Sequence, residues 1–148
     1  MEENIENLIR ESLKAYGVLN VRRLSRGEGM VYMVGLMSLP LIIQNTLTIA
    51  LNAKGFTVSS GMLFDLKDTP EEVASRAEFL LRQVAEKRGL TPWKAADSLM
   101  LRKEGRKLEE LPQALVNLVE AVKELNNLFS EEPILDECLQ KKWSNVLF

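Results

Sequence analysis

Residues 30–53 read MVYMVGLMSLPLIIQNTLTIALNA and contain no charged side chain. A run of this length raises the question of a membrane-spanning helix. Gly35, Ser38 and Pro40 interrupt its apolar part, however, and the polar residues from Gln44 onward would each need a hydrogen-bond partner in lipid. The stretch therefore predicts a buried central helix and no membrane association. Because Pro40 removes a backbone donor, we expect two helices or one kinked helix here.

The segments around this stretch carry further helix signals. Residues 5–16 follow the three-four apolar spacing of a helix that ends at Gly17, and residues 18–29 are typical of an exposed loop. Further helices are expected over residues 70–88, 92–103 and 112–129 and from Pro133, with a small β-hairpin at 56–66. The predicted fold class is mainly α. It is a single helical domain over residues 1–148, an irregular bundle of five to seven helices with the hairpin as an appendage.

The composition excludes several classes of catalytic site. The chain of 148 residues has no histidine and one cysteine, so it cannot form a Cys/His zinc site, a Ser-His-Asp triad or an internal disulfide. We expect no enzymatic activity, no metal and no cofactor. A metal-dependent enzyme using Asp65 and Asp68 is kept as an alternative. The unpaired Cys138 and the acidic start of the chain, where a signal peptide would be basic, predict a cytoplasmic protein.

Charges of opposite sign are segregated along the chain. Residues 76–107 hold nine basic and four acidic side chains, whereas residues 109–137 hold one basic and eight acidic side chains. Flexible cations near helix ends suit contacts with nucleic-acid phosphates, although a solvated helix surface would carry the same residues. The acidic helix is expected to meet a basic neighbour, including other copies of this chain. The candidate nucleic-acid-binding residues are Arg22, Arg23, Arg26, Arg82, Arg88, Arg102, Lys103, Arg106 and Lys107.

The end of the chain and one tryptophan offer further contact sites. The last six residues, WSNVLF, are mostly apolar and need a surface to pack on, which is either the core of the domain or a partner protein. Trp93 is expected in the core rather than stacked on a base. These features keep a second function open, that of a protein-interaction adaptor without nucleic-acid binding. The candidate partner-binding residues are Trp143, Val146, Leu147 and Phe148.

A segment of the chain resembles a known family. Tyr32, the Leu39-Pro40 pair, Asn45 and the Ala53-Lys54 pair are similar to the tyrosine, Leu-Pro, Asn-Gly-Leu and Ala-Lys stretch of the small α-helical subunit of CRISPR effector complexes, of the Cascade-like or Cmr type. The resemblance implies a non-catalytic subunit for antiviral defence that stacks in several copies along the guide RNA. It would contact the backbone of target DNA or RNA and dock on other protein subunits. No functional residue is carried over from the resemblance itself.

Overall fold

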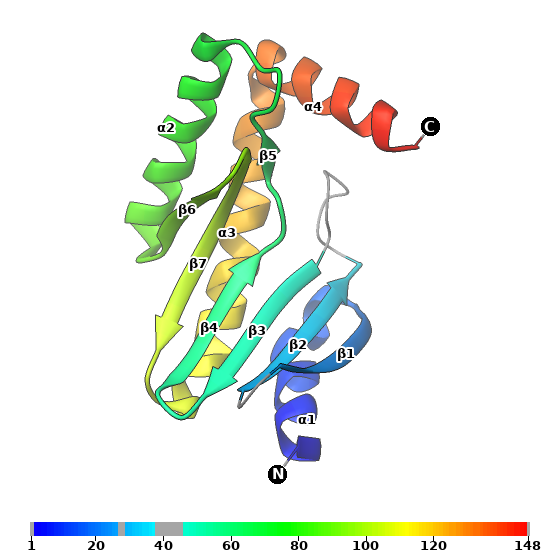
Figure 1. The fold of residues 1–148 in the computed structure, drawn as a ribbon, viewed down its shortest axis with the longest axis vertical. Coiled ribbons are helices and arrows are strands. Elements are labelled where there is room, and N and C mark those ends of the chain that lie inside the picture. Colours follow the sequence, from blue (N-terminus) through cyan, green and yellow to red (C-terminus); the bar gives the residue numbers. More distant parts are fainter. Residues whose placement is uncertain (1, 27–28, 38–45, 148) are drawn as a thin grey trace.

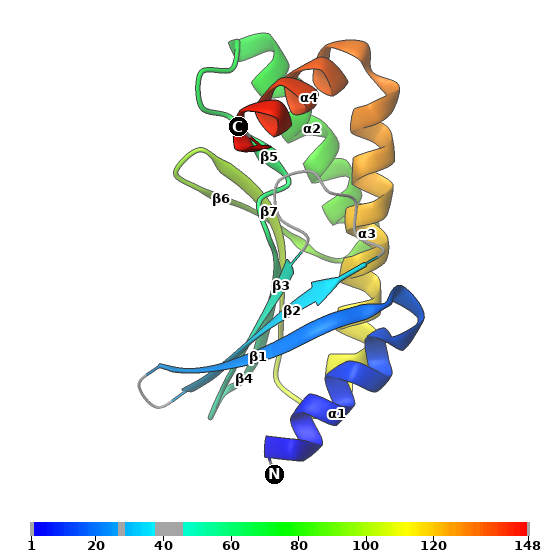
Figure 2. The same cartoon turned by 90° about the vertical axis from the view of Figure 1, so that its right-hand side faces the viewer.

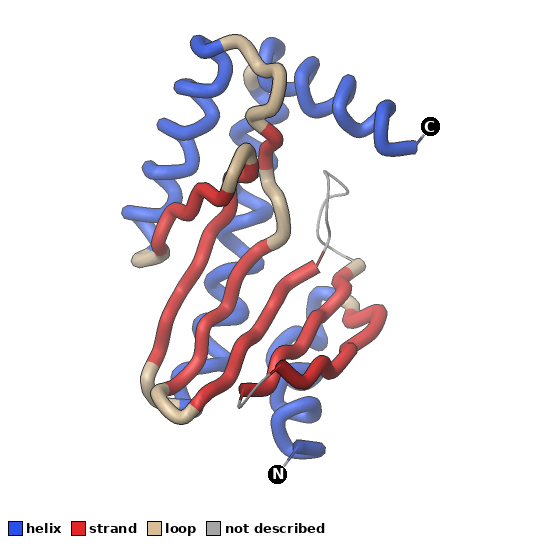
Figure 3. Tube along the Cα trace, viewed as in Figure 1, coloured by secondary structure: helices blue, strands red, loops and turns tan. Residues whose placement is uncertain are grey.

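The computed structural model describes residues 2–26, 29–37 and 46–147, with side chains over 4–24, 29–37 and 46–140. Its helices are α1 (Glu2–Leu13), α2 (Glu71–Arg88), α3 (Leu111–Glu131) and α4 (Pro133–Leu147), with single 3-10 turns η1 (Lys14–Tyr16) and η2 (Leu108–Glu110). Its strands are β1 (Val18–Arg26), β2 (Gly29–Leu36), β3 (Thr46–Asn52), β4 (Gly55–Ser60), β5 (Phe64–Asp65), β6 (Thr91–Ala95) and β7 (Ser98–Gly105). Figure 3 shows these helices and strands along the trace.

The strands form one twisted antiparallel sheet (Figure 1). Along the sheet the order is β1-β2-β3-β4-β7. The chain leaves the sheet for α2 after β5 and returns through β6 to β7, which pairs with β4. The short β5 pairs with the start of β7, and β6 pairs with the other side of β7. Among the described residues β1 pairs with β2 alone, so β1 is an open edge of the sheet.

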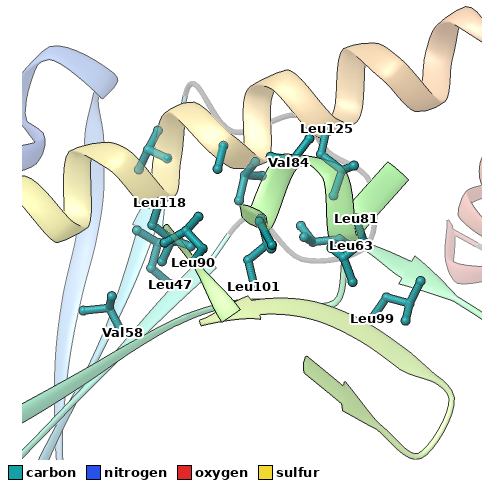
Figure 4. Packing of buried hydrophobic residues seen from close by; sticks show 14 of the residues in the cluster. Leu47, Val58, Leu63, Leu81, Val84, Leu90, Leu99, Leu101, Leu118 and Leu125 are labelled. Carbon is teal, nitrogen blue, oxygen red and sulfur yellow. The ribbon is translucent and has the colours of Figure 1, made fainter. Parts of the chain in front are cut away.

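Helices α1, α2 and α3 lie on one side of the sheet, and the other side of β2, β3 and β4 is open in the view of Figure 2. Alternate residues of each strand point into the helical layer, where Val34, Ile49, Val58 and Leu101 are fully buried. Figure 4 shows Leu118 and Leu125 of α3 in one cluster with strand residues such as Leu101 and with Leu81 and Val84 of α2. The buried apolar side chains form one continuous cluster between the two layers.

The prediction of a mainly α bundle with five to seven helices is wrong. The uncharged stretch forms β2 and β3, on either side of residues 38–45, which lie outside the described residues together with the expected kink. Tyr32 and Val34 point into the core, yet Val31 and Met33 on the open face are uncharged as well. The alternation that identifies a half-buried strand is therefore missing, and an apolar run of this kind is not distinguished from a helix by its pattern.

Three further expectations are corrected by the strand pairing. The expected loop at 18–29 contains β1. The expected hairpin at 56–66 is not one, since β4 pairs with β3 and β7 while β5 pairs with β7 alone. The expected helix at 92–103 is the β6–β7 hairpin. Pro92, which predicts the start of a helix, lies instead in edge strand β6. Proline has no backbone N–H, and it is tolerated at an edge position where that N–H would point to solvent and not to a neighbouring strand.

The remaining helix predictions are confirmed. The first helix continues into η1 and ends at Gly17, whose φ of 74° is the left-handed conformation expected of a helix-ending glycine. The helices over 70–88 and 112–129 correspond to α2 and α3, and Pro133 begins α4. All are amphipathic or begin with a specific first-turn signal, so local sequence is sufficient for them.

We predict that Gly55→Ala destabilises the protein by more than about 2 kcal/mol, because the new Cβ would collide with the backbone of Gly105 and Arg106. Gly55 has a φ of 141° at the first position of β4, directly after the turn that follows β3. Gly89→Ala is the matched control, since Gly89 also has a positive φ of 67° but no atom within 4 Å of the added Cβ. That control is expected to cost about 1 kcal/mol. Equal losses in urea unfolding of the two variants would contradict the close approach at Gly55.

Candidate functional site

The basic residues predicted to contact nucleic acid do not form one surface. The side chain of Arg26 lies outside the described residues. Arg102 and Lys103 are consecutive in β7 and therefore point to opposite faces of the sheet. The others lie in three separate regions, namely the exposed edge strand β1 (Arg22, Arg23), helix α2 (Arg82, Arg88) and the segment after β7 (Arg106, Lys107).

Cations of α2 are paired with acids on α3 and at its C-terminal end. Lys87 Nζ donates to Glu124 at 3.1 Å, and Arg88 Nε donates to the other oxygen of the same carboxylate at 2.9 Å. Arg76 Nε donates to Glu132, just before α4, at 2.8 Å. Part of the charge segregated along the sequence is thus used inside the chain, where cations of α2 pair with acids on and just after α3.

These ion pairs lower the pKa of the Glu124 and Glu132 carboxyls. Burial alone would raise the pKa of the Glu124 carboxyl, but hydrogen bonds from Lys87 and Arg88, together with their charges, outweigh it and lower the pKa below its ordinary value of 4.5. The hydrogen bond from Arg76 likewise lowers the pKa of the Glu132 carboxyl. Both carboxylates therefore stabilise the folded state above pH 4.5, and this contribution is lost as pH falls through their lowered pKa values.

Arg102 lies on the open face of the sheet rather than at the surface of a helix. Its guanidinium stacks over the ring of Trp93, 4.3 Å from the centroid, and donates to Glu104 at 3.4 Å. Trp93 is 43% exposed, so the expectation that it packs in the core is wrong. Beside this pair the open face is hollowed by about 270 Å³. The hollow is lined mainly by uncharged side chains, among them Met33, Thr46, Thr48, Ser59 and Met100.

Strand β1 presents a different surface at the open edge of the sheet. It reads VLNVRRLSR over nine residues, with three arginines and no acid. Arg22 is opposite Met33 in the register and Arg23 is opposite Tyr32, so successive arginines belong to opposite faces. At the start of β1 the register shifts between Val18 and Asn20, and the intervening Leu19 is 53% exposed.

A third region lies at the end of the sheet formed by the β3–β4 turn and the end of β7, which we call the foot. Here Arg106 follows β7, and Lys54 occupies the turn before Gly55. The backbone of Gly55 lies directly against Arg106, so two cations distant in sequence become neighbours. Sequence reasoning named Arg106 but missed Lys54, because only the β4–β7 pairing brings the two segments together.

The other candidate residues are not joined into a site. Asp65 accepts the backbone N–H of Lys67 at 2.9 Å, and Asp68 has a φ of 56° in the following turn. Within the described part of the chain, no three or more His, Cys, Asp and Glu side chains are grouped to hold a metal ion. The predicted partner-binding side chains of Trp143, Val146, Leu147 and Phe148 lie outside the described residues.

Comparison with known proteins leaves the family of this chain open. Neither the family models, nor the curated proteins, nor the solved structures searched include a match to the chain. Over the described residues, no helix combines the length and apolarity needed to cross a membrane. The resemblance to a CRISPR small subunit therefore stays a prediction.

We predict that Glu124→Gln destabilises the protein by about 1 kcal/mol at pH 7, because Lys87 and Arg88 lose their shared carboxylate. The difference in stability between the variant and the unchanged protein should shrink as pH falls below 4.5. Glu124 is then protonated and becomes uncharged, as Gln is at every pH. Glu131→Gln is the matched control at an exposed site of the same helix, and thermal unfolding between pH 3 and 7 is the measurement. A difference that stays constant over this range would contradict the lowered pKa.

Proposed function

We propose that this protein is a non-catalytic binding module that takes up an extended, acidic segment of a partner protein as an additional strand beside β1. One observation carries the proposal. β1 is a nine-residue open edge with three arginines and no acid. The proposal belongs to the class of interaction proteins that the sequence left open, and it uses β1 rather than the C-terminal residues as the contact.

The backbone of β1 supports strand addition. Every second N–H and C=O of an edge strand points away from its only neighbour and is free to bind another extended chain. The pairing of β1 with β2 is continuous from Asn20 to Arg26, so the opposite edge is regular over the same length. Main-chain hydrogen bonds along such an edge supply affinity, and side chains on the two faces supply specificity.

The arginines favour an acidic partner over a second copy of this chain. Two β1 strands paired with each other would bring several arginines together across the ladder, and like charges opposite one another destabilise a strand pair. An incoming strand with acidic side chains would instead meet Arg22 on the open face and Arg23 on the helical face. Charges of this kind set which partner binds and how fast it associates.

Exposed apolar side chains next to β1 complete the surface. Met37 is 71% exposed, and its N–H donates to the carbonyl of Gly17 at 2.8 Å, which brings it to the start of β1. Leu19 is exposed at the same end. Large apolar side chains gathered beside an open edge favour contact with another protein, whereas protection of the edge by charge alone would not need them. Along β1 the exposed apolar side chains lie at its start and the arginines follow. A partner segment with apolar residues at one end and acidic residues next to them fits this arrangement.

We predict that peptides selected from a displayed random library on the purified full chain are enriched in Asp and Glu. Binding of a selected peptide should protect β1 amides from hydrogen exchange, which is the signature of strand addition. The Arg22→Glu, Arg23→Glu double variant should weaken binding at least tenfold, because both faces of the edge then repel the peptide. Fluorescence polarisation of the labelled peptide measures this loss.

The matched control is the Arg82→Glu, Lys107→Glu double variant, which makes the same change of net charge at exposed positions away from β1. It should bind the peptide as well as the unchanged chain does. Selected peptides without excess acid, or an equal loss in both double variants, would overturn the proposal. So would protection confined to amides outside β1.

Binding of RNA or DNA phosphates, as in a CRISPR-type effector complex, stays a prediction from the sequence. The pairing of Arg88 with Glu124 and of Arg102 with Glu104 favours the protein-binding proposal over it, because a phosphate would have to displace a carboxylate at each position. Of the other candidate cations, Arg82 lies on α2 and Lys103 on β7, and the rest are divided between β1 and the segment after β7.

Fluorescence anisotropy with single-stranded RNA, single-stranded DNA and duplex DNA separates the two functions. We expect weak binding to all three, and we expect the variant with Glu at positions 102, 103, 106 and 107 to keep its affinity for the selected peptide. Tight nucleic-acid binding that falls steeply with salt and is lost in this variant, while its circular dichroism is unchanged, would replace the proposal with the nucleic-acid function.

A further inference from the structure

The hydrophobic core is open at the foot of the sheet. A pocket of about 510 Å³ lies there between the strands and the helical layer, within the size range of small-molecule sites. Its walls come from five different elements and are mostly apolar. The apolar side chains that line it are Ile5 of α1, Met30 of β2, Leu51 of β3, Phe56 of β4 and Leu108 of η2.

The position of these residues shows why the pocket is apolar. Met30 and Leu51 are partners across β2 and β3, and Leu51 and Phe56 are partners across β3 and β4, so all three point to the helical side of the sheet. Phe56 is almost fully buried, and its ring lies over Gly105, where any side chain would collide with it. Leu108 is 43% exposed at the mouth. The pocket thus continues the core outward to the surface.

One end of the pocket is cationic. Arg106 is the only charged side chain among the described residues that line it. A second, more polar hollow of about 460 Å³ adjoins this one. It shares Asn52, Gly55, Phe56 and Arg106 with the first and is also lined by Lys54. Glu104 lines the polar hollow as well, but its carboxylate accepts from Arg102. Neither Arg106 nor Lys54 has an ion-pair partner among the described residues.

We infer that this pocket binds an amphipathic carboxylate, a medium-chain fatty acid, with its acyl chain among the apolar side chains and its head group at Arg106 and Lys54. The exposed cations Arg106 and Lys54 favour an anionic head group at the mouth, because they can donate charge-assisted hydrogen bonds to a carboxylate. The apolar walls select the chain, which gains free energy with each methylene taken out of water. The ligand would fill the open end of the core and stabilise the folded state.

The test uses the full chain with three probes of equal chain length, decanoate, decanol and decyltrimethylammonium, each below its micelle concentration. Decanoate is expected to raise the melting temperature and to bind at least tenfold more tightly than decanol by calorimetry. The cationic probe should give no stabilisation. In methyl NMR spectra, decanoate should shift the signals of Ile5, Leu51 and Leu108.

Two variants separate the contribution of the ligand's head group to binding from that of its acyl chain. Arg106→Gln should lower decanoate affinity about tenfold and leave decanol affinity unchanged, whereas Met30→Trp should fill the pocket and abolish binding of both. Arg82→Gln is the control for loss of a surface arginine and should change neither. The Arg22→Glu, Arg23→Glu variant should also bind decanoate normally, so failure of the strand-addition proposal and failure of this inference are distinguishable.

Equal affinity for the three probes would overturn the inference, because the cationic mouth would then select nothing. Methyl NMR shifts confined to the open face of the sheet would overturn it as well, since the acyl chain of decanoate would then lie outside the pocket. Unchanged decanoate binding by Met30→Trp, with its fold intact by circular dichroism, would have the same consequence.

Discussion

The contact between α3 and the inner face of the sheet holds the whole molecule together. Leu115 and Leu118 of α3 are fully buried, as are Ile49 and Leu101 on the sheet. Contacts of α3 with α1 and α2 extend the same core sideways. Truncating one such leucine removes about 2–5 kcal/mol, which is a large part of the stability of a domain this size. Every other feature of the fold is positioned by this layer.

The same packing decides which charges remain available. Because α3 must bury one side on the sheet, its acidic side chains lie away from the sheet, and Glu124 meets Lys87 and Arg88 of α2. One turn earlier on the same side of α3, Glu120 accepts from the hydroxyl of Tyr16 at 2.8 Å. Burial of that hydroxyl and its bond to the carboxylate raise the pKa of Tyr16. At the foot, Arg106 and Lys54 have no ion-pair partner among the described residues.

Within the described part of the chain the helices α1, α2 and α3 cover one side of the sheet, and three kinds of surface are left. The open face is mostly uncharged, the β1 edge is basic, and the foot combines an apolar pocket with a cationic mouth. An antiparallel sheet tolerates one uncovered face, but in that case the face usually alternates to polar residues. Here Val31 and Ala50 lie on it beside the uncharged polar side chains of Thr48 and Ser59. The two proposals use the edge and the foot, where charge as well as apolar contact defines what binds.

The sequence by itself determined the helices. The apolar spacing of residues 5–16 and 112–129, the glycine after the first helix and the prolines at 70 and 133 act within a few residues, so they predict α1, α2, α3 and the start of α4 correctly. It also determined that the chain has no histidine-based chemistry. Of the proposed sites, the sequence identified Arg22, Arg23 and Arg106 as candidates through their charge.

Only the tertiary structure decided the sheet and the sites on it. The sequence of β2 and β3 predicts helices because both faces of these strands are uncharged. Which strand pairs with which depends on contacts between residues far apart in the chain. Because the β4–β7 pairing joins residues far apart in the sequence, the sequence does not predict that Lys54 lies near Arg106. It does not predict the pocket at the foot either. Whether a cation is paired or free also depends on the partner that packing brings to it. Helix signals are local, but strand pairing, ion pairs and pockets are properties of the folded arrangement.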